Sequence, residues 1–137
     1  MYQRDYLLTE ARKLALLLAK LMSLKAEEEY DEYVRQFNDA LQDEYGVELK
    51  ELLNLNEAEF IIFINSAGYS AEKLHALAQM LYVFAEPLKI DNETGLTLRK
   101  ILIIFDLLEQ RDRQLSFENI EKRKIIYKHL IKIHERP

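Results

Sequence analysis

The spacing of apolar residues along the chain predicts an all-helical protein. In residues 4–24, apolar side chains return every three or four positions, which places them on one face of a helix. These residues are Leu7, Ala11, Leu14, Leu18 and Leu21. Leu8, Ala15 and Met22 widen this face, and Leu17 and Leu24 extend it further. Such width favours burial by more than one neighbour, including a partner helix. Helical spacing and capping signals predict further helices over residues 26–45, 47–54, 56–67, 71–86, 96–110 and 117–135.

Two of these helices have patterns that predict which residues face inward. In residues 26–45 the expected buried face consists of Tyr30, Val34, Phe37 and Leu41, with Tyr33, Ala40 and Tyr45 beside it. In residues 117–135 the expected inward residues are Phe117, Ile120, Tyr127, Leu130 and Ile131, flanked by Ile126 and Ile133. The remaining positions of both helices are largely charged and are expected to face water.

Two other segments are apolar without a clear period. Residues 60–64 and 101–105 are each an unbroken apolar run, which fits either a buried strand or a buried helix. Asn56 and Glu59 form a variant of the capping box ahead of the first run, and this favours a helix. The second run is apolar on all sides, so a helix there should be central, with neighbours on both faces. A mixed fold with strands at both places is the alternative.

Turn residues are scarce, with three glycines and two prolines in 137 residues. Gly46, Gly68, Gly95 and Pro87 each fall at a predicted helix boundary, and residues 87–95 are the clearest predicted loop. An all-β fold needs more turns than this. Short connections place successive helices antiparallel. We therefore expect one all-α domain over residues 1–137, with six or seven helices stacked as antiparallel hairpins, either tetratricopeptide-like or as a bundle.

Charge is distributed unevenly along the chain, which has a net charge of −5. Residues 1–69 contain 7 Lys and Arg against 14 Asp and Glu, whereas residues 70–137 contain 12 against 10. The acidic total argues against general nucleic-acid binding, since affinity for phosphates is electrostatic. The last helix is nevertheless basic and amphipathic, so it could pack on its own chain or meet an acidic protein, an anionic surface or nucleic acid. Its candidate partner-binding residues are Lys124, Lys128 and Lys132.

Tyrosines gather in the acidic half of the chain. Tyrosine is common at interfaces because it combines apolar area with a hydroxyl group. Most of these side chains are expected to bridge core and surface, and a minority could line a peptide-binding groove. Among them, Tyr30 and Tyr33 are the candidate partner-binding residues.

The sequence contains no recognisable catalytic, metal or cofactor constellation. It has no cysteine and no glycine-rich phosphate loop. Glu72 and His75 have the E-x-x-H spacing of di-iron bundles, but a second such pair is missing. We therefore predict no catalytic, cofactor-binding or metal-binding residue. The alternative is an enzyme or small-molecule binder with a helix-lined pocket near His75, Glu72 and Gln79.

Targeting signals are also absent from the pattern. The apolar stretch at residues 14–22 is interrupted by Lys20 and is preceded by acidic residues, which argues against a signal peptide. No stretch reaches 18 apolar residues, so no transmembrane helix is expected. A cytoplasmic location is the resulting expectation.

Three short motifs carry a resemblance to a known group of proteins. Arg4-Asp5-Tyr6-Leu7-Leu8, Leu18-Ala19-Lys20-Leu21 and Leu115-Ser116-Phe117-Glu118 resemble a family of small bacterial helical proteins of uncharacterised function. Some members of that family have tetratricopeptide-like hairpins. The resemblance covers most of the chain and implies an all-helical fold and a bacterial cytoplasmic origin. It implies no activity and no site residues.

These observations favour a non-enzymatic protein–protein interaction module without a cofactor. Its partner would be another protein or a second copy of the chain, as the wide apolar face of residues 4–24 suggests. The two alternatives are the pocket near His75 and the binding of nucleic acid or an anionic surface through the last helix. The second alternative predicts binding that weakens steeply with salt.

Overall fold

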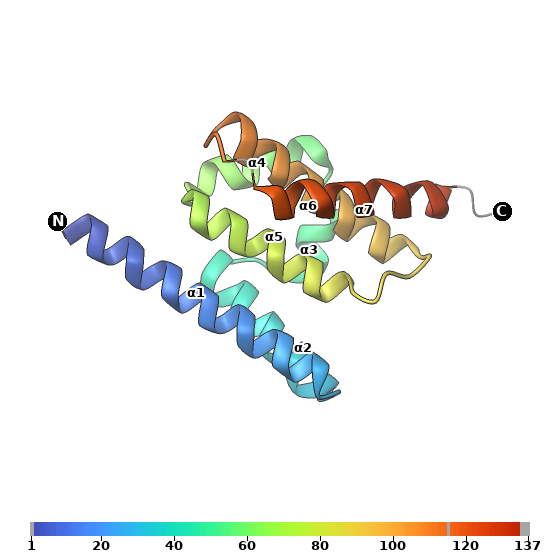
Figure 1. Cartoon of the computed structure of the whole chain (residues 1–137), viewed down its shortest axis with the longest axis horizontal. Coiled ribbons are helices and arrows are strands. Elements are labelled where there is room, and N and C mark those ends of the chain that lie inside the picture. The colour runs from blue at the N-terminus through green and yellow to red at the C-terminus, as the bar shows by residue number, and fades with distance from the viewer. Residues whose placement is uncertain (1, 115, 135–137) are drawn as a thin grey trace. The chain divides into compact units, whose positions relative to one another are not determined.

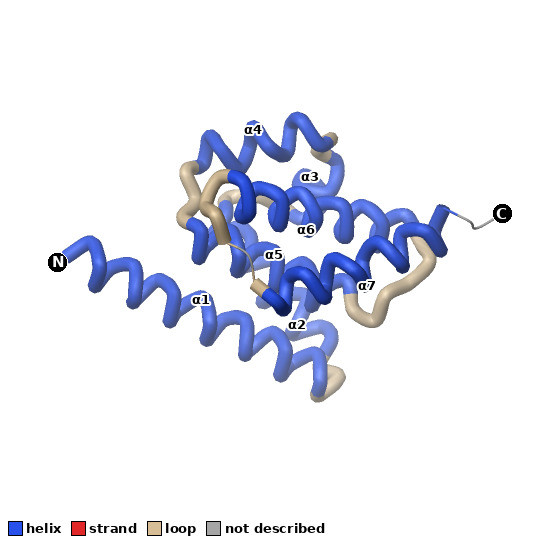
Figure 2. The backbone as a smooth tube through the Cα atoms, turned by 45° about the horizontal axis from the view of Figure 1, so that its top comes forward, coloured by secondary structure: helices blue, strands red, loops and turns tan. Residues whose placement is uncertain are grey.

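The computed structural model describes residues 2–114 and 116–134, with side chains from Thr9 onward. The side chains of Tyr2, Tyr6, Leu7 and Leu8, together with Leu115 and residues 135–137, lie outside the described residues. Every regular element from residue 2 to 134, apart from residue 115, is helical: seven α-helices and one π-helical turn (Figure 2). The all-α prediction is confirmed. The alternative with strands at residues 60–64 and 101–105 is wrong, because both runs lie inside helices.

Chain contacts divide the protein into two compact units, Met1–Asn54 and Leu55–Pro137. Whether they act as the single domain expected from the sequence stays a prediction, and each unit is described by itself. The first contains α1 (Tyr2–Ala26), α2 (Tyr30–Ala40), a π-helical turn η1 (Leu41–Tyr45) and α3 (Leu49–Asn54). The second contains α4 (Glu57–Ala67), α5 (Ala71–Ala85), α6 (Asn92–Gln110) and α7 (Phe117–His134).

In the first unit, α1 and α2 form an antiparallel hairpin (Figure 1). The connection is Glu27–Glu29, because α1 ends at Ala26, two residues after the predicted end of the first helix. Glu28 adopts a left-handed conformation with φ 59°, and the amide of Glu29 donates to the carbonyl of Leu24 at 2.9 Å. This hydrogen bond satisfies one of the carbonyl groups that have no hydrogen-bond donor at the C-terminal end of a helix. The second helix therefore begins at Tyr30 rather than at residue 26.

The buried face of α2 differs from the predicted one. Tyr30 and Val34 are 54% and 47% exposed, whereas the residues expected beside the face are buried. The buried set is Tyr33, Phe37, Ala40, Leu41 and Tyr45. The turn η1 widens the helix after Ala40, which keeps Tyr45 on the same side as Leu41. Gly46 ends η1 with φ 67°, the left-handed conformation that glycine adopts readily.

In the second unit, α6 packs against α4, α5 and α7 (Figures 1 and 2). Its residues Leu98, Ile101, Ile104 and Phe105 are 0–1% exposed, as expected for a central helix. The predicted helix starts are confirmed at α4 and α5. Asn56 and Glu59 form a complete capping box, and the Ser70 hydroxyl accepts from the amide of Lys73 at 3.1 Å.

The predicted loop over residues 87–95 is too long. Helix α6 begins at Asn92, because the Asp91 carboxylate accepts a hydrogen bond from the amide of Thr94 at 2.8 Å and caps the helix there. Gly95 is therefore inside α6 and buried, not at a helix boundary. The side chain of Ile133 on α7 lies 3.7 Å from the place where a Cβ atom of residue 95 would be. This is an ordinary van der Waals distance, so α7 leaves room for a Cβ atom at residue 95.

Candidate interaction surface

Helix α7 is held on the second unit by a narrow inner face. The hydroxyl of Ser116 accepts from the amide of Asn119 at 3.0 Å, so the predicted N-cap is confirmed. The buried residues of α7 are Asn119, Ile126 and Leu130, which are 7%, 0% and 9% exposed. Their spacing of seven and four residues places them on one side of the helix.

Three of the residues predicted to face inward on α7 are exposed. Phe117 is 78% exposed, Ile131 is 57% exposed and Tyr127 is 51% exposed. The prediction is wrong for these residues because apolar side chains occur on nearly every side of α7, so periodicity alone does not identify its inner face. The inner position nearest the start of α7 is occupied by the polar Asn119, whose amide oxygen lies 3.4 Å from Nε2 of His75.

The exposed residues form a mixed apolar and basic surface. Phe117, Lys124, Lys128 and Ile131 are separated by seven, four and three residues, so they follow one line along the helix. Tyr127 and Lys132 flank this line on opposite sides. All six side chains are exposed. We refer to these six residues as the α7 outer surface. The exposed Glu121 lies on the same line, between Phe117 and Lys124.

Two other basic residues of α7 are used within the second unit. Lys122 donates to the side-chain oxygen of Gln79 on α5 and lies 2.9 Å from the carboxylate of Glu118. The hydrogen bond from Lys122 holds the pKa of Glu118 below its ordinary value. The ammonium group also lies 5.0 Å from the centre of the Tyr82 ring. Lys122 therefore fixes α7 to α5 and is not part of the α7 outer surface.

Arg123 has the same role toward α6. Its guanidinium nitrogens lie 2.9 Å from Glu109 and 3.2 Å from Asp106, and its centre is 5.9 Å from the ring of Phe105. Lys124 differs, since it pairs at 3.2 Å with its own helix neighbour Glu121 and both side chains are exposed. The structure thus separates the basic residues of α7 into those that fasten the helix and those that face outward.

His75 lies in a polar network between α5 and α7. Its Nε2 atom is 3.2 Å from Nε2 of Gln79 and 3.4 Å from Oδ1 of Asn119. Gln79 and Asn119 are buried, and Gln79 also accepts from Lys122. Glu72, the predicted companion of His75, is exposed. Each polar group of this network contacts another across the helix interface, so the network accounts for how α7 is positioned.

The two candidate tyrosines of α2 lie in different environments. Tyr30 is 54% exposed and is accessible to a partner. Tyr33 is 3% exposed, stacks on Phe37 with ring centres 5.9 Å apart, and has the ammonium group of Lys25 5.2 Å from its ring centre. Tyr33 therefore belongs to the packing of the first unit, and contact with a partner would require that packing to open.

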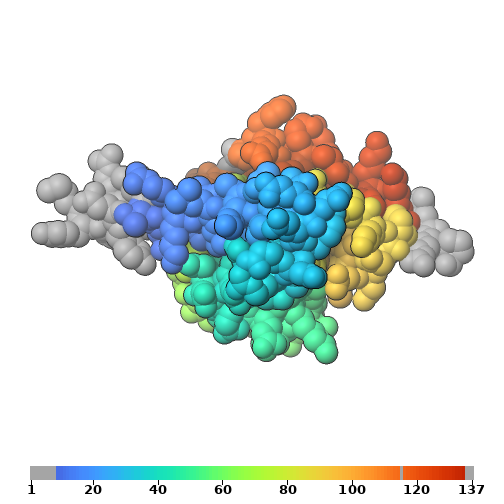
Figure 3. All heavy atoms as spheres, turned by 90° about the horizontal axis from the view of Figure 1, so that it is seen from below, coloured from blue at the N-terminus to red at the C-terminus, as the bar shows by residue number. Residues whose placement is uncertain are grey.

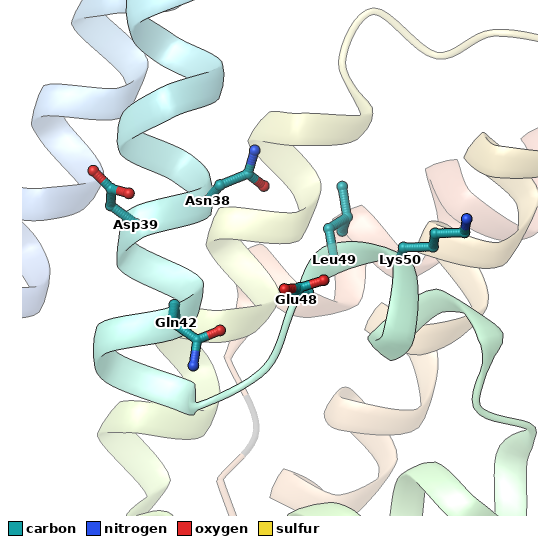
Figure 4. Close-up of a pocket in the computed structure, with 6 residues that line it drawn as sticks. All are labelled: Asn38, Asp39, Gln42, Glu48, Leu49 and Lys50. Atoms are coloured by element: carbon teal, nitrogen blue, oxygen red, sulfur yellow. The ribbon is translucent and has the colours of Figure 1, made fainter.

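The first unit has a hollow of about 530 Å³ on its surface (Figure 4). It is lined by Asn38, Asp39, Gln42, Glu48, Leu49 and Lys50. Figure 4 shows these side chains spread along α2, η1 and the start of α3, without convergence on one point. A binding pocket normally places a few polar groups around a common centre. We therefore assign no ligand to this hollow.

Metal binding and membrane spanning find no support in the described residues. In residues 9–114 and 116–134, whose side chains the structure describes, no three His, Asp or Glu side chains are grouped so that they could hold a metal ion. Within that same part of the chain, no helix combines the length and the apolar character needed to cross a membrane.

Comparison with known proteins gives no relative. No family model, curated protein or solved structure matches this chain. The resemblance to small bacterial helical proteins stays a prediction.

Sequence reasoning selected the three lysines of the α7 outer surface but missed Phe117 and Ile131. A usable signal was present. Lys124 and Lys128 lie on the same side of the helix as these two apolar residues, and a face with two lysines at its centre is rarely buried. Giving the charged positions priority over the apolar ones would have identified Phe117 and Ile131 as outward residues.

Proposed function

We propose that this protein is a non-enzymatic protein–protein interaction module that binds an acidic, amphipathic segment of a partner through the α7 outer surface. One observation carries the proposal: Phe117, Tyr127 and Ile131 are 78%, 51% and 57% exposed beside exposed lysines. Large apolar side chains gathered on one exposed face are typical of interaction sites.

The lysines of this surface specify the chemistry of the partner. Lys124, Lys128 and Lys132 are exposed, and each could face a carboxylate of a bound segment. Apolar residues of the partner would cover Phe117 and Ile131 at the same time. Such a partner would associate faster at low salt, because complementary charges steer the encounter.

Two features favour a protein partner over a bilayer or nucleic acid. A helix that lies on a membrane separates its apolar side chains from its charged ones. Here Lys124 and Lys128 lie between Phe117 and Ile131 on the same line of the helix. The chain also has a net charge of −5, which disfavours a long contact with phosphates.

The test is capture of interacting proteins from an extract of the source cells by the immobilised full chain. The double variant Lys124→Glu/Lys128→Glu should lose the proteins that the unchanged chain retains. The control Lys50→Glu/Lys89→Glu makes the same charge change at exposed positions of α3 and the α5–α6 connection and should retain them.

Three results would contradict the proposal. One is that no protein is retained, and another is that the α7 variant retains the same proteins as the unchanged chain. The third is retention that disappears on nuclease treatment or is replaced by binding to anionic vesicles. That result would instead support the second candidate, which is binding of nucleic acid or an anionic surface through the same lysines.

A further inference from the structure

The side of α1 that faces away from the core of its unit is unusually apolar. Leu16 and Met22 are 67% and 52% exposed, and Ala15, Ala19 and Ala26 are exposed beside them. We refer to these five residues as the α1 outer face; the described part of α1 is at the surface in Figure 3. The opposite side of the helix contributes Leu14, Leu21 and Leu24 to the core, with at most 7% exposure. The prediction that Ala15 and Met22 widen the buried face of residues 4–24 is therefore wrong, because these two residues lie on the side of α1 opposite Leu14, Leu21 and Leu24.

Charged residues lie at the margin of this face, where Lys20 is exposed one turn after Leu16, and Ser23 is an exposed polar residue within it. Lys13 is turned toward η1, where its ammonium group is 2.7 Å from the carboxylate of Glu44. Arg12 lies at one end of the face, and Glu27 follows the other end. A helix face that meets only water normally carries charged or polar side chains along its length. The α1 outer face therefore has the composition of a contact surface.

The face is symmetric in sequence about Ala19. Leu16 and Met22 are each three residues from Ala19, and Arg12 and Ala26 are each seven residues from it. Two antiparallel copies of α1 that cross at Ala19 would therefore place Leu16 of each copy against Met22 of the other. The small side chain of Ala19 would meet itself on the twofold axis and allow the helices to approach closely. A twofold contact requires this reciprocity of residue pairs.

Charge also favours the antiparallel arrangement. In that arrangement Arg12 of one copy lies opposite Ala26 and Glu27 of the other, and the same pair occurs a second time by symmetry. Glu28 and Glu29 extend the acidic end. In a parallel arrangement Arg12 would face Arg12, and the acidic ends would face each other. Opposite charges across an interface fix its register, and like charges suppress the wrong one.

We propose that the α1 outer face is the contact of a homodimer in which α1 packs antiparallel on α1 of a second copy, centred on Ala19. The inference goes beyond the proposed function, since it concerns a different helix and a different partner. It buries Leu16 and Met22 and joins Arg12 to Glu27 twice. The α7 outer surface takes no part in it.

The first test is sedimentation velocity of the full chain over a concentration series up to about 100 µM, a range that covers weak dimers. The unchanged chain should form a dimer. Leu16→Glu should weaken the dimer at least tenfold, because it places two carboxylates in the apolar contact. Ile62→Glu on α4 is the matched control, since Ile62 is 64% exposed, and it should leave the dimer unchanged.

The second test measures the register of the contact. The chain has no cysteine, so Ala19→Cys introduces a single thiol. This thiol should form a disulfide between copies under mild oxidation. Arg12→Cys should not form one, because seven residues on each side of the axis separate the two thiols by about 21 Å along the helices.

Several outcomes would overturn the inference. One is a monomeric unchanged chain over the whole series, as expected if another part of the same chain or a different protein covers the face. Another is that Leu16→Glu and Ile62→Glu weaken the dimer to the same degree. A third is that Ala19→Cys and Arg12→Cys form disulfides between copies to the same degree, which would indicate a parallel contact or random collision. Retained circular dichroism of each variant excludes unfolding as the cause. Leu16→Glu should still capture the α7 partner, so failure of the dimer and failure of the proposed function are distinguishable.

Discussion

A guanidinium nitrogen of Arg123 on α7 lies 2.9 Å from a carboxylate oxygen of Glu109 on α6. The same side chain approaches Asp106 at 3.2 Å and covers the ring of Phe105. Arg123 therefore joins two helices through charge and through its apolar stem. Burial holds the pKa of Asp106 above its ordinary value, and the nearby Arg123 opposes that rise.

Replacing Arg123 should therefore destabilise the second unit. We expect Arg123→Ala to lower the free energy of unfolding by about 1–2 kcal/mol at neutral pH, since an ion pair and packing on Phe105 are both lost. Lys124→Ala is the control and should cost less than about 0.5 kcal/mol, because the Lys124–Glu121 pair is exposed. The measurement is urea unfolding followed by circular dichroism.

The effect of Arg123→Ala should also depend on pH. As pH falls through the raised pKa of Asp106, this carboxylate is protonated and its attraction to Arg123 disappears. The difference between the unchanged chain and the variant should therefore shrink in acid. A loss that is equal for Arg123→Ala and Lys124→Ala, or that does not depend on pH, would contradict this description of the α6–α7 contact.

The glycines of α6 and of the α4–α5 connection should respond in opposite ways to alanine. Gly95 is inside α6, and an added Cβ would be in ordinary contact with Ile133 at 3.7 Å. Gly95→Ala should raise the free energy of unfolding by about 0.5–1 kcal/mol, since alanine favours a helix interior. Gly68 has φ 67°, so Gly68→Ala should lower it by about 1 kcal/mol through backbone strain alone. Thermal unfolding of the two variants measures whether each change raises or lowers stability. A change in the same direction for both variants would contradict the helical conformation of Gly95 or the left-handed conformation of Gly68.

The third prediction concerns the effect of the buried Tyr33 hydroxyl on stability. Among the described residues no group hydrogen-bonds to this hydroxyl, and burial raises the pKa of Tyr33 above its ordinary value of 10.0. Tyr33→Phe should therefore raise the free energy of unfolding at neutral pH by about 1 kcal/mol, because it removes a buried polar group without a partner.

The sign of the pH dependence follows from the raised pKa. Above about pH 10 the unfolded chain loses the Tyr33 proton while the folded chain keeps it, so the unchanged protein loses stability as pH rises. Tyr33→Phe should lose less over the same range, although Tyr69 and Tyr82 still titrate. Urea unfolding at about pH 7 and about pH 11 measures the difference. A variant that is less stable at neutral pH and equally sensitive to alkali would show that the hydroxyl is satisfied.

The positions of most helices could be predicted because local chemistry determines them. Asn56 with Glu59, and Ser70, are caps whose bonding partners lie three residues away, so the signal and its structural effect are both in the local sequence. The start of α6 was missed, since Gly95 was interpreted as a loop residue although Asp91 is an equally local cap.

Which residues of α2 and α7 are buried depends on contacts with other helices, and these contacts are not visible in the local sequence. Tyr33 rather than Tyr30 is buried because Tyr33 stacks on Phe37 and lies beside Lys25 of α1, and this packing between two helices is not visible in the pattern of α2 alone. On α7, Asn119 is turned inward by contact with His75, which is 44 residues away in the sequence. These contacts require the packed structure, whereas the lysines on the same side of α7 are a local signal for the exposure of Phe117 and Ile131.

The central claim concerns the α7 outer surface, and the most direct measurement is the affinity of a captured partner for the full chain at about 50 mM and about 200 mM salt. We predict that the unchanged chain binds less tightly at the higher salt. Lys124→Glu/Lys128→Glu should weaken binding at least tenfold at low salt and reduce the salt dependence, and Phe117→Asp should weaken binding at both salt concentrations. Equal affinities of the unchanged chain and both variants would contradict the assignment of α7 as the interaction surface.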